Sequence, residues 1–291
     1  IRSDGIEGKD YCYSGACTSG GSFSTCANAD GTTTTSDFSY NRIKNKIDEY
    51  PIYIDQDDYN DSKEIRLAYL FEEPTDMACG TAAEAEEAIR MALSALGLSD
   101  IVLNRTLYIS HDRMVQADEL MQTEEWSGSV KGGEISQFQG NDWSEADDCY
   151  MFEFFCGIDG IPLSYQSWKR ETTTYCGNYI TAWYDTDGLL SVGVYYPWVA
   201  DEVAEEPDQV ISAEEALQVV QNKIGNVITG QNQELQSLTL RYLYRQDGDA
   251  WLLIPVWEAV IHQASKDPDS WVPESCTYVT VDAITGKEIV S

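Results

Sequence analysis

Two stretches of the chain place apolar residues three and four positions apart, the spacing of a helix with one apolar face. Each stretch opens on a pair of residues spaced as a capping box, in which two side chains satisfy free backbone N–H groups of the first turn. We therefore predict helices over residues 81–96 and 212–224. The capping pairs are Thr81 with Glu84 and Ser212 with Glu215, and the apolar positions are Ala85, Ala88, Ile89, Ala92, Leu93 and Leu96, then Ala213, Ala216, Leu217, Val220 and Ile224.

Strand-type runs surround both predicted helices. Turns at Asp187-Gly188 and Asp247-Gly248 join neighbouring runs as hairpins. The pattern predicts an α+β protein with antiparallel sheets. The runs are PIYI and IRLAYLF before the first helix, IVLNRTLYIS, CYMFEFFCGIDGIPLS and YITAWYDTDGLLSVGVYYP after it, and SLTLRYLYR, AWLLIPVWEAVI and CTYVTVDAITGKEIVS after the second helix.

The chain divides into three predicted parts. Residues 1–40 are rich in Gly, Ser, Thr and Cys and are interpreted as an N-terminal tether. Residues 41–205 form a first α+β unit, with a polar surface excursion at 111–148, and residues 206–291 form a second unit. The run TAAEAEEAI matches SAEEALQVV, and CYMFEFFCGIDGIPLS matches CTYVTVDAITGKEIVS, which predicts an internal duplication.

The charge balance narrows the classes of partner. The chain carries 50 Asp and Glu against 18 Lys and Arg, a formal net charge of −32. Such a surface repels phosphate backbones and anionic lipid headgroups, so nucleic-acid binding and direct membrane-surface binding are excluded. The charge is interpreted as serving solubility, while a cationic partner or loose calcium binding stays open.

Eight scattered cysteines predict disulfides in an oxidising compartment. A zinc site needs tightly spaced Cys or His ligands, but no CxxC pair occurs and the chain has two histidines, so neither metal nor cofactor is expected. An extracytoplasmic location requires a signal or anchor, and no apolar run reaches the roughly 18 residues of a membrane span. We expect a preceding signal peptide, lipid anchor or transmembrane segment. The cysteines are Cys12, Cys17, Cys26, Cys79, Cys149, Cys156, Cys176 and Cys276.

Catalytic motifs are absent from the sequence, which predicts a non-enzymatic protein. HExxH, GxSxG, GxGxxG and Walker A patterns do not occur. His111 and His262 each follow a strand-type run and are interpreted as edge or turn residues. The acidic stretch 55–64 lacks the glycine of a calcium loop and is interpreted as solvated. No catalytic, cofactor-binding or metal-binding residue is therefore assigned.

Two alternatives to a protein-binding role remain open. Exposed tryptophans could stack on sugar rings, which describes a surface carbohydrate-binding protein, and an opposed carboxylate pair could serve a secreted hydrolase. A row of exposed aromatics would favour the first, and a cleft with two carboxyls of raised pKa the second. An apolar patch on a sheet face would favour a protein partner. The tryptophans considered are Trp126, Trp143, Trp168, Trp183, Trp198 and Trp271 as exposed side chains, with core packing preferred for Trp183, Trp251 and Trp257.

The carboxy-terminal unit resembles a PepSY-type domain. The resemblance rests on ISAEEALQVV, LLIPVWEAVI and the closing YVTVDAITGKEIV, whose end fits the family pattern V-D-x-x-T-G-[KE]. In this turn the side chains of Asp282 and Thr285 can bond backbone groups, and Gly286 can take a positive φ. The turn is thus structural and not a site. The matching residues are Val281, Asp282, Thr285, Gly286 and Lys287.

Over roughly residues 78–291 the chain is similar to the duplicated YycH/YycI-type extracytoplasmic regulators. Their first unit ends in an aromatic strand followed by G-I-P, found here as Gly160, Ile161 and Pro162. The resemblance implies two tandem PepSY-like units, each a helix packed on an antiparallel sheet. It also implies binding of an envelope protein, either a sensor kinase or a protease. The Cys-rich head, the excursion and the predicted disulfides depart from the pattern.

Overall fold

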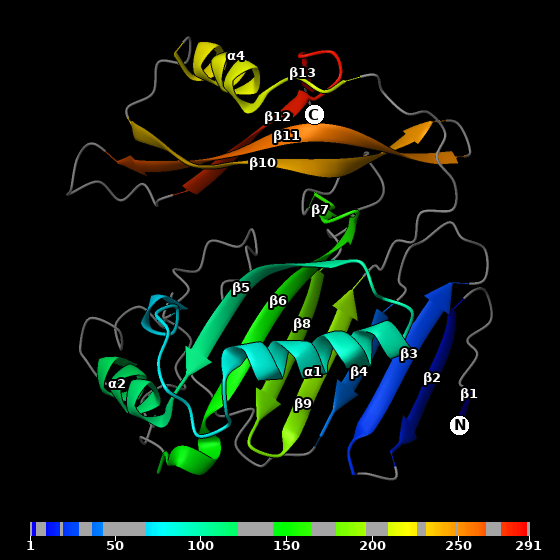
Figure 1. Ribbon diagram of the computed structural model, residues 1–291, viewed down its shortest axis with the longest axis vertical. Helices are drawn as coiled ribbons and strands as arrows, with labels where there is room; N and C mark the ends of the chain where they lie inside the picture. Colours follow the sequence, from blue (N-terminus) through cyan, green and yellow to red (C-terminus); the bar gives the residue numbers. More distant parts are fainter. Residues whose placement is uncertain are drawn as a thin grey trace, which may run out of the picture. The chain divides into compact units, whose positions relative to one another are not determined.

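The computed structural model places most of the chain in two compact units (Figure 1). Unit 1 comprises Ile1–Ser99, Leu103–Phe154 and Tyr179–Tyr195, and unit 2 comprises Asp100–Val102, Phe155–Asn178 and Tyr196–Ser291. The structure describes residues 2–3, 10–17, 20–28, 37–42, 68–121, 142–164, 179–195, 209–225, 231–247, 250–265 and 275–289.

Unit 1 is built on a sheet with the strand order β1-β2-β3-β4-β9-β8-β6-β5. The pairs from β1 to β4, and those joining β4, β9, β8 and β6, are antiparallel. The last residues of β6, Gly157 and Ile158, pair with the two-residue strand β7 (Ile161–Pro162), and all four residues belong to unit 2. The other strands are β1 (Arg2–Ser3), β2 (Asp10–Ala16), β3 (Ser22–Asn28), β4 (Asp37–Asn41), β5 (Ile101–Ile109), β6 (Cys149–Ile158), β8 (Tyr179–Asp185) and β9 (Gly188–Tyr195).

The head of the chain differs from the predicted tether. Within residues 1–40, strands β2, β3 and β4 belong to the unit 1 sheet, and β4 pairs with β9 far along the sequence. Backbone register places Cys12 opposite Cys26. Part of the predicted tether therefore lies in the same sheet as strands of the first predicted unit. The physical reason is that edge strands gain their partners from distant segments, which local composition does not reveal.

Helix α1 (Ala82–Ala95) confirms the first predicted helix. Thr81 and Glu84 form the capping box, and the hydrogen bonds from Thr81 lower the pKa of Glu84. Ala85, Ile89 and Leu93 are fully buried on the face that packs against β8 and β9.

The predicted surface excursion at 111–148 contains a second part of the unit 1 core. Helix α2 (His111–Met121) buries Met114 and Ala117 against Leu107 and Trp143. Two short 3-10 helices, η2 (Ala68–Leu70) and η4 (Glu145–Asp147), lie before and after α2 in the sequence. Residues 111–121 of the predicted excursion are thus a helix that packs on the core, with apolar positions Met114, Ala117 and Leu120 three residues apart in a run of only 11 residues.

Unit 2 contains an antiparallel four-stranded sheet in the order β10-β11-β12-β13. Helix α4 (Ala213–Gly225) confirms the second predicted helix and packs on β11 and β12. Ser212 and Glu215 cap it, as predicted. The strands are β10 (Gln231–Asp247), β11 (Ala250–Ser265), β12 (Ser275–Asp282) and β13 (Glu288–Ile289), and the buried core is Val220, Ala259, Ile261, Val279 and Val281.

The final turn has the structural role predicted for it. Oδ1 of Asp282 accepts hydrogen bonds from the backbone N–H groups of Ile284 (2.9 Å) and Thr285 (2.8 Å). Gly286 has a φ of 68°, a conformation that costs a glycine little.

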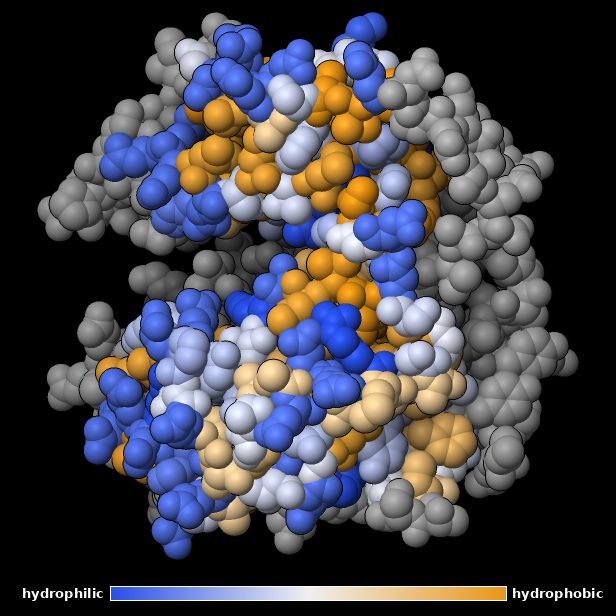
Figure 2. All heavy atoms as spheres, in the orientation of Figure 1, coloured by the Kyte–Doolittle hydropathy of each residue, from blue (hydrophilic) through white to orange (hydrophobic). Residues whose placement is uncertain are grey.

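The protein is therefore of the α+β class, with mainly antiparallel sheets. An isolated parallel bridge joins Leu163 to Tyr242 within unit 2. Hydrophilic residues are spread over the visible surface of each unit, in keeping with the high net charge (Figure 2). In the described part of the chain, no helix is both long and apolar enough to cross a bilayer.

Candidate functional site

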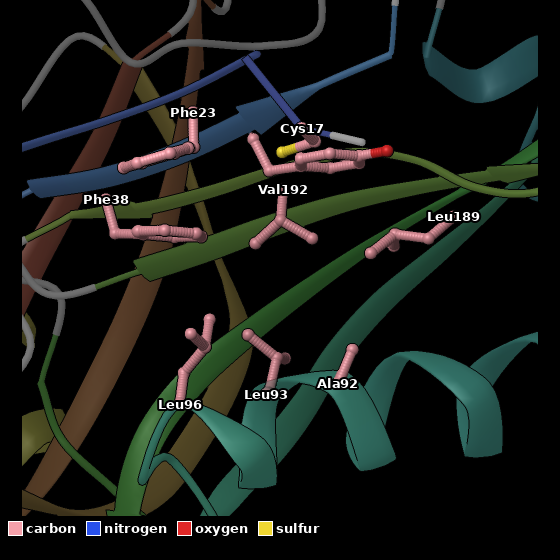
Figure 3. A pocket seen from close by; sticks show the side chains of 9 residues that line it. Cys17, Phe23, Phe38, Ala92, Leu93, Leu96, Leu189 and Val192 are labelled. Carbon is pink, nitrogen blue, oxygen red and sulfur yellow. The ribbon is translucent and has the colours of Figure 1, made fainter. Parts of the chain in front are cut away.

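An apolar hollow of about 320 Å³ lies in unit 1 beside α1. This volume falls at the lower end of the range for small-molecule sites. Side chains of α1 rise toward it from one side, and side chains of β3, β4 and β9 face them from the other (Figure 3). None of the lining residues carries a charge. They are Cys17, Phe23, Phe38, Tyr40, Ala92, Leu93, Leu96, Leu189 and Val192.

Strand register explains why β3 and β4 present aromatic side chains here. Phe23 pairs with Tyr40, and Tyr40 pairs with Val192, so the three side chains lie on one face of the sheet. Because α1 packs on β8 and β9, it leaves Phe23, Phe38 and Tyr40 half-buried. The hollow is the place where the helix stops covering an apolar sheet face.

Gly15 leaves the space that the ring of Phe23 occupies. It pairs with Phe23 across β2 and β3, and a Cβ at this position would lie 2.9 Å from Cε1 of the ring. A larger residue at position 15 would force the Phe23 ring to move. The glycine thus helps to place one wall of the hollow.

Acidic side chains lie near one end of the hollow. Asp185 ends β8, and Asp187 lies in the turn that leads to the lining residue Leu189 of β9. Arg42 forms an ion pair with the buried Asp185, and its Nη1 lies 3.7 Å from Oδ2 of Asp187. The Asp187 side chain is 82% exposed. One guanidinium therefore faces two carboxylates at this corner.

The lining of the hollow suits an apolar group. Burial of apolar surface contributes roughly 25 cal/mol per Å². The polar groups among the lining side chains are the thiol of Cys17 and the hydroxyl of Tyr40. Among the described residues, no group of three or more His, Cys, Asp or Glu is placed to hold a metal ion.

Described tryptophans do not form an exposed row. Trp143 is 7% exposed, and its Nε1 donates to Oδ2 of Asp118 (2.7 Å). Trp183 packs half-buried against the unit 1 core, and Trp257 packs half-buried in unit 2 with Nε1 donating to the carbonyl of Ile211 (3.0 Å). The predictions for Trp126, Trp168, Trp198, Trp271, the side chain of Trp251 and the acidic stretch 55–64 lie outside the described residues.

Glu258 is a buried carboxyl of unit 2 whose pKa is raised by burial, against the opposing effects of Arg241 and of a hydrogen bond from Ser164. Its Oε1 lies 3.0 Å from Nε of Arg241. The partners of Glu258 are thus a cation and a hydroxyl, whereas the hydrolase alternative needs a second carboxyl across a cleft.

His111 opens α2 and is bonded to a buried carboxylate. Oδ1 of Asp148 accepts hydrogen bonds from the backbone N–H of His111 (2.7 Å) and from its Nδ1 (2.8 Å), while Oδ2 accepts from the backbone N–H of Ala78 (3.0 Å). This contact ties the start of α2 to the loop before α1. His262 lies half-buried in β11, opposite Cys276.

The stability of unit 1 is expected to fall as pH rises through the range where His111 titrates. The hydrogen bond with Asp148 raises the pKa of His111, and the charges of Asp148, Asp112 and Glu145 also favour its protonated form. A raised folded-state pKa stabilises the fold fully below the unfolded value of about 6.5, and this contribution disappears above the folded value.

Hydrogen exchange of α2 against pH measures this effect. His111→Asn keeps a hydrogen-bond donor that does not titrate. In this variant, the protection of α2 from exchange should change less between slightly acidic and slightly alkaline pH than it does in the wild type. An unchanged pH profile in His111→Asn would assign the dependence to other groups.

Sequence reasoning missed the residues of the hollow on the strand side. Phe23, Phe38 and Tyr40 lie in the predicted tether, although SFST and DFSY each alternate apolar and polar residues. That alternation was the available signal, but two such short runs in a Ser-rich segment are weak evidence for strands.

Comparisons with known proteins support the fold alone. No family model matches the sequence, and no curated protein matches it. A crystal structure of an uncharacterized protein from Eubacterium rectale ATCC 33656 is similar, with a TM-score of 0.60 and 17% sequence identity. The match covers 97% of this chain and 76% of that chain. The two chains therefore share a fold.

Proposed function

We propose that the chain is a non-catalytic protein-binding module that acts outside the cytoplasmic membrane and anchors its partner in the hollow of unit 1. The observation that carries this proposal is the uncovered, half-buried aromatic face of β3 and β4 beside α1. Contiguous apolar surface of this kind is typical of interaction sites. A partner at the cell envelope, such as a sensor kinase or a protease, fits the resemblance to PepSY-type and YycH/YycI-type proteins.

The order of elements supports a duplicated, PepSY-like architecture as part of this proposal. In unit 1, α1 precedes β5, β6, β8 and β9, which are neighbours in the sheet in that order. In unit 2, α4 precedes β10, β11, β12 and β13, again neighbours in chain order. Each helix packs on strands of its own unit. In both units a helix is thus followed by four strands that are neighbours in chain order, with α2 and β7 interrupting the series in unit 1.

Two substitutions on α1 test the proposed function. Ala92 lines the hollow, whereas Met91 is 63% exposed on the outward side of the helix. Ala92→Phe should fill the hollow and lower recovery of the partner at least about tenfold, the loss expected for a central anchor contact. Met91→Phe adds the same ring to the same helix and should leave recovery unchanged.

The measurement is cross-linked affinity capture by the full chain from envelope fractions of the source organism. A protein captured by the wild type and by Met91→Phe, and lost with Ala92→Phe, is the expected result. Equal recovery with all three chains would exclude the hollow as the anchor. Recovery of glycan without protein would favour the carbohydrate-binding alternative.

A further inference from the structure

We propose that the hollow binds a cationic peptide segment of the partner, in which a short apolar stretch is flanked by Lys or Arg on both sides. This inference rests on the proposed function and adds the chemistry of the occupant to it. The lining requires the centre of the segment to be apolar, because no lining residue carries a charge. The two ends of the hollow determine what flanks that centre.

One end of the hollow is acidic. Leu189 lies toward this end, and before it in the sequence come Asp185, at the end of β8, and Asp187, in the turn, which both face the guanidinium of Arg42. Asp185 is buried against Arg42, whereas the carboxylate of Asp187 is exposed and lies 3.7 Å from Nη1 of the same guanidinium. A lysine or arginine of the occupant can therefore reach Asp187 from the solvent side and share its carboxylate with Arg42.

The other end of the hollow lies at the C-terminus of α1. Leu96 and Leu189 lie toward opposite ends of the hollow (Figure 3). A helix C-terminus carries a partial negative charge and favours cations within the last turn. The last turn of α1 contains no basic residue, so the helix itself does not supply that cation. A basic residue of the occupant fits this end as well.

The charge of the whole chain acts in the same direction. With a net charge of −32, the protein repels anionic segments and steers cationic ones toward its surface. Long-range attraction alone does not choose a position, but the apolar hollow does. The combination predicts affinity that depends on both the apolar centre and the flanking charges.

Three matched synthetic peptides test the proposal with the full-length protein. Each has a Leu-Phe-Leu centre with three lysines, three glutamines or three glutamates on either side. Binding is measured by fluorescence anisotropy at low and high salt. The lysine peptide should bind most tightly and weaken with salt, the glutamine peptide should be at least about tenfold weaker, and the glutamate peptide should not bind.

Substitutions separate the hollow from the general acidic surface. Ala92→Phe should lower the affinity for the lysine peptide at least about tenfold, whereas Met91→Phe should leave this affinity unchanged. Asp187→Asn should lower the affinity for the lysine peptide about twofold, as expected for an exposed ion pair. Glu87→Gln, on the exposed side of α1, should leave this affinity unchanged.

Cys17 offers an independent readout within the hollow. It is a half-buried free thiol among the lining residues. Its alkylation by iodoacetamide, followed by peptide mass spectrometry, should slow when the lysine peptide is bound. Protection of Cys17 places the peptide in the hollow and not elsewhere on the acidic surface.

Three results would overturn the proposal, and they differ in what they leave standing. Equal binding of the glutamine and lysine peptides, with loss in Ala92→Phe, removes the charge requirement but keeps the hollow as a protein-binding site. Equal binding of the lysine peptide to wild type and Ala92→Phe reduces the interaction to diffuse charge. If no peptide binds, the cationic-segment proposal is wrong, and capture with Ala92→Phe decides the proposed function separately.

Discussion

Replacing Glu258 by alanine is expected to destabilise unit 2 by about 3–5 kcal/mol, the usual cost of removing one partner of a buried ion pair. The residue is 3% exposed and pairs with Arg241. The guanidinium of Arg241 lies 4.7 Å from the ring centroid of Phe155, and its Nη1 donates to the carbonyl of Leu163 (3.3 Å). Without Glu258, this largely buried cation loses its counter-charge, and the hydroxyl of Ser164 loses its hydrogen bond to the carboxylate.

A double variant tests whether the unpaired charge is the cause. Arg241→Met with Glu258→Leu replaces the pair by apolar side chains of similar length, a change that is often close to neutral. The free energy of unfolding of both variants is measured by denaturant titration, and hydrogen exchange of β10 and β11 reports the stability of unit 2. Glu258→Ala should lose far more protection than the double variant. If the two variants lose equal stability, packing and not charge determines the cost.

Helices α1 and α4, strands β5, β6, β8 and β9 of unit 1 and the strands of the unit 2 sheet could be predicted because their signals are local. The capping boxes at Thr81 and Ser212 lie within one turn of the apolar stripes that they begin, and both were confirmed in the structure. Asp282 and Gly286 likewise form their turn within five residues. Interactions of this range are visible in a short window of sequence.

The head of the chain and α2 were missed because their partners are distant in sequence. Tyr40 pairs with Val192, and Trp143 bonds to Asp118 across the segment that was predicted as a surface excursion. Neither contact has a local signature. The strand side of the hollow could not be predicted for the same reason, whereas its helix side, Ala92 and Leu96, was already part of the predicted apolar stripe.

Phe152→Ala is expected to destabilise unit 1 by about 3–5 kcal/mol, as large-to-small changes of buried aromatic residues do. Phe152 is fully buried in β6, opposite Ala182 of β8. Its ring centroid lies 5.8 Å from that of Tyr150 and 6.1 Å from that of Phe154. Because Ala182 already leaves space across the strand, a second small residue would leave a cavity that neighbouring rings cannot easily fill.

Leu96→Ala is the matched control for Phe152→Ala, since Leu96 lines the hollow but is half-exposed, and it should cost less than about 1 kcal/mol. Hydrogen exchange of β6 and β8 measures both changes. If Phe152→Ala loses no more stability than Leu96→Ala, the row of Tyr150, Phe152 and Phe154 is not a rigid core. Below its unfolding transition, Phe152→Ala should still bind the lysine peptide, whereas Ala92→Phe should remain folded and fail to bind it. Stability and binding in unit 1 would then depend on opposite ends of the same apolar face, with the covered end holding α1 and the uncovered end holding the partner.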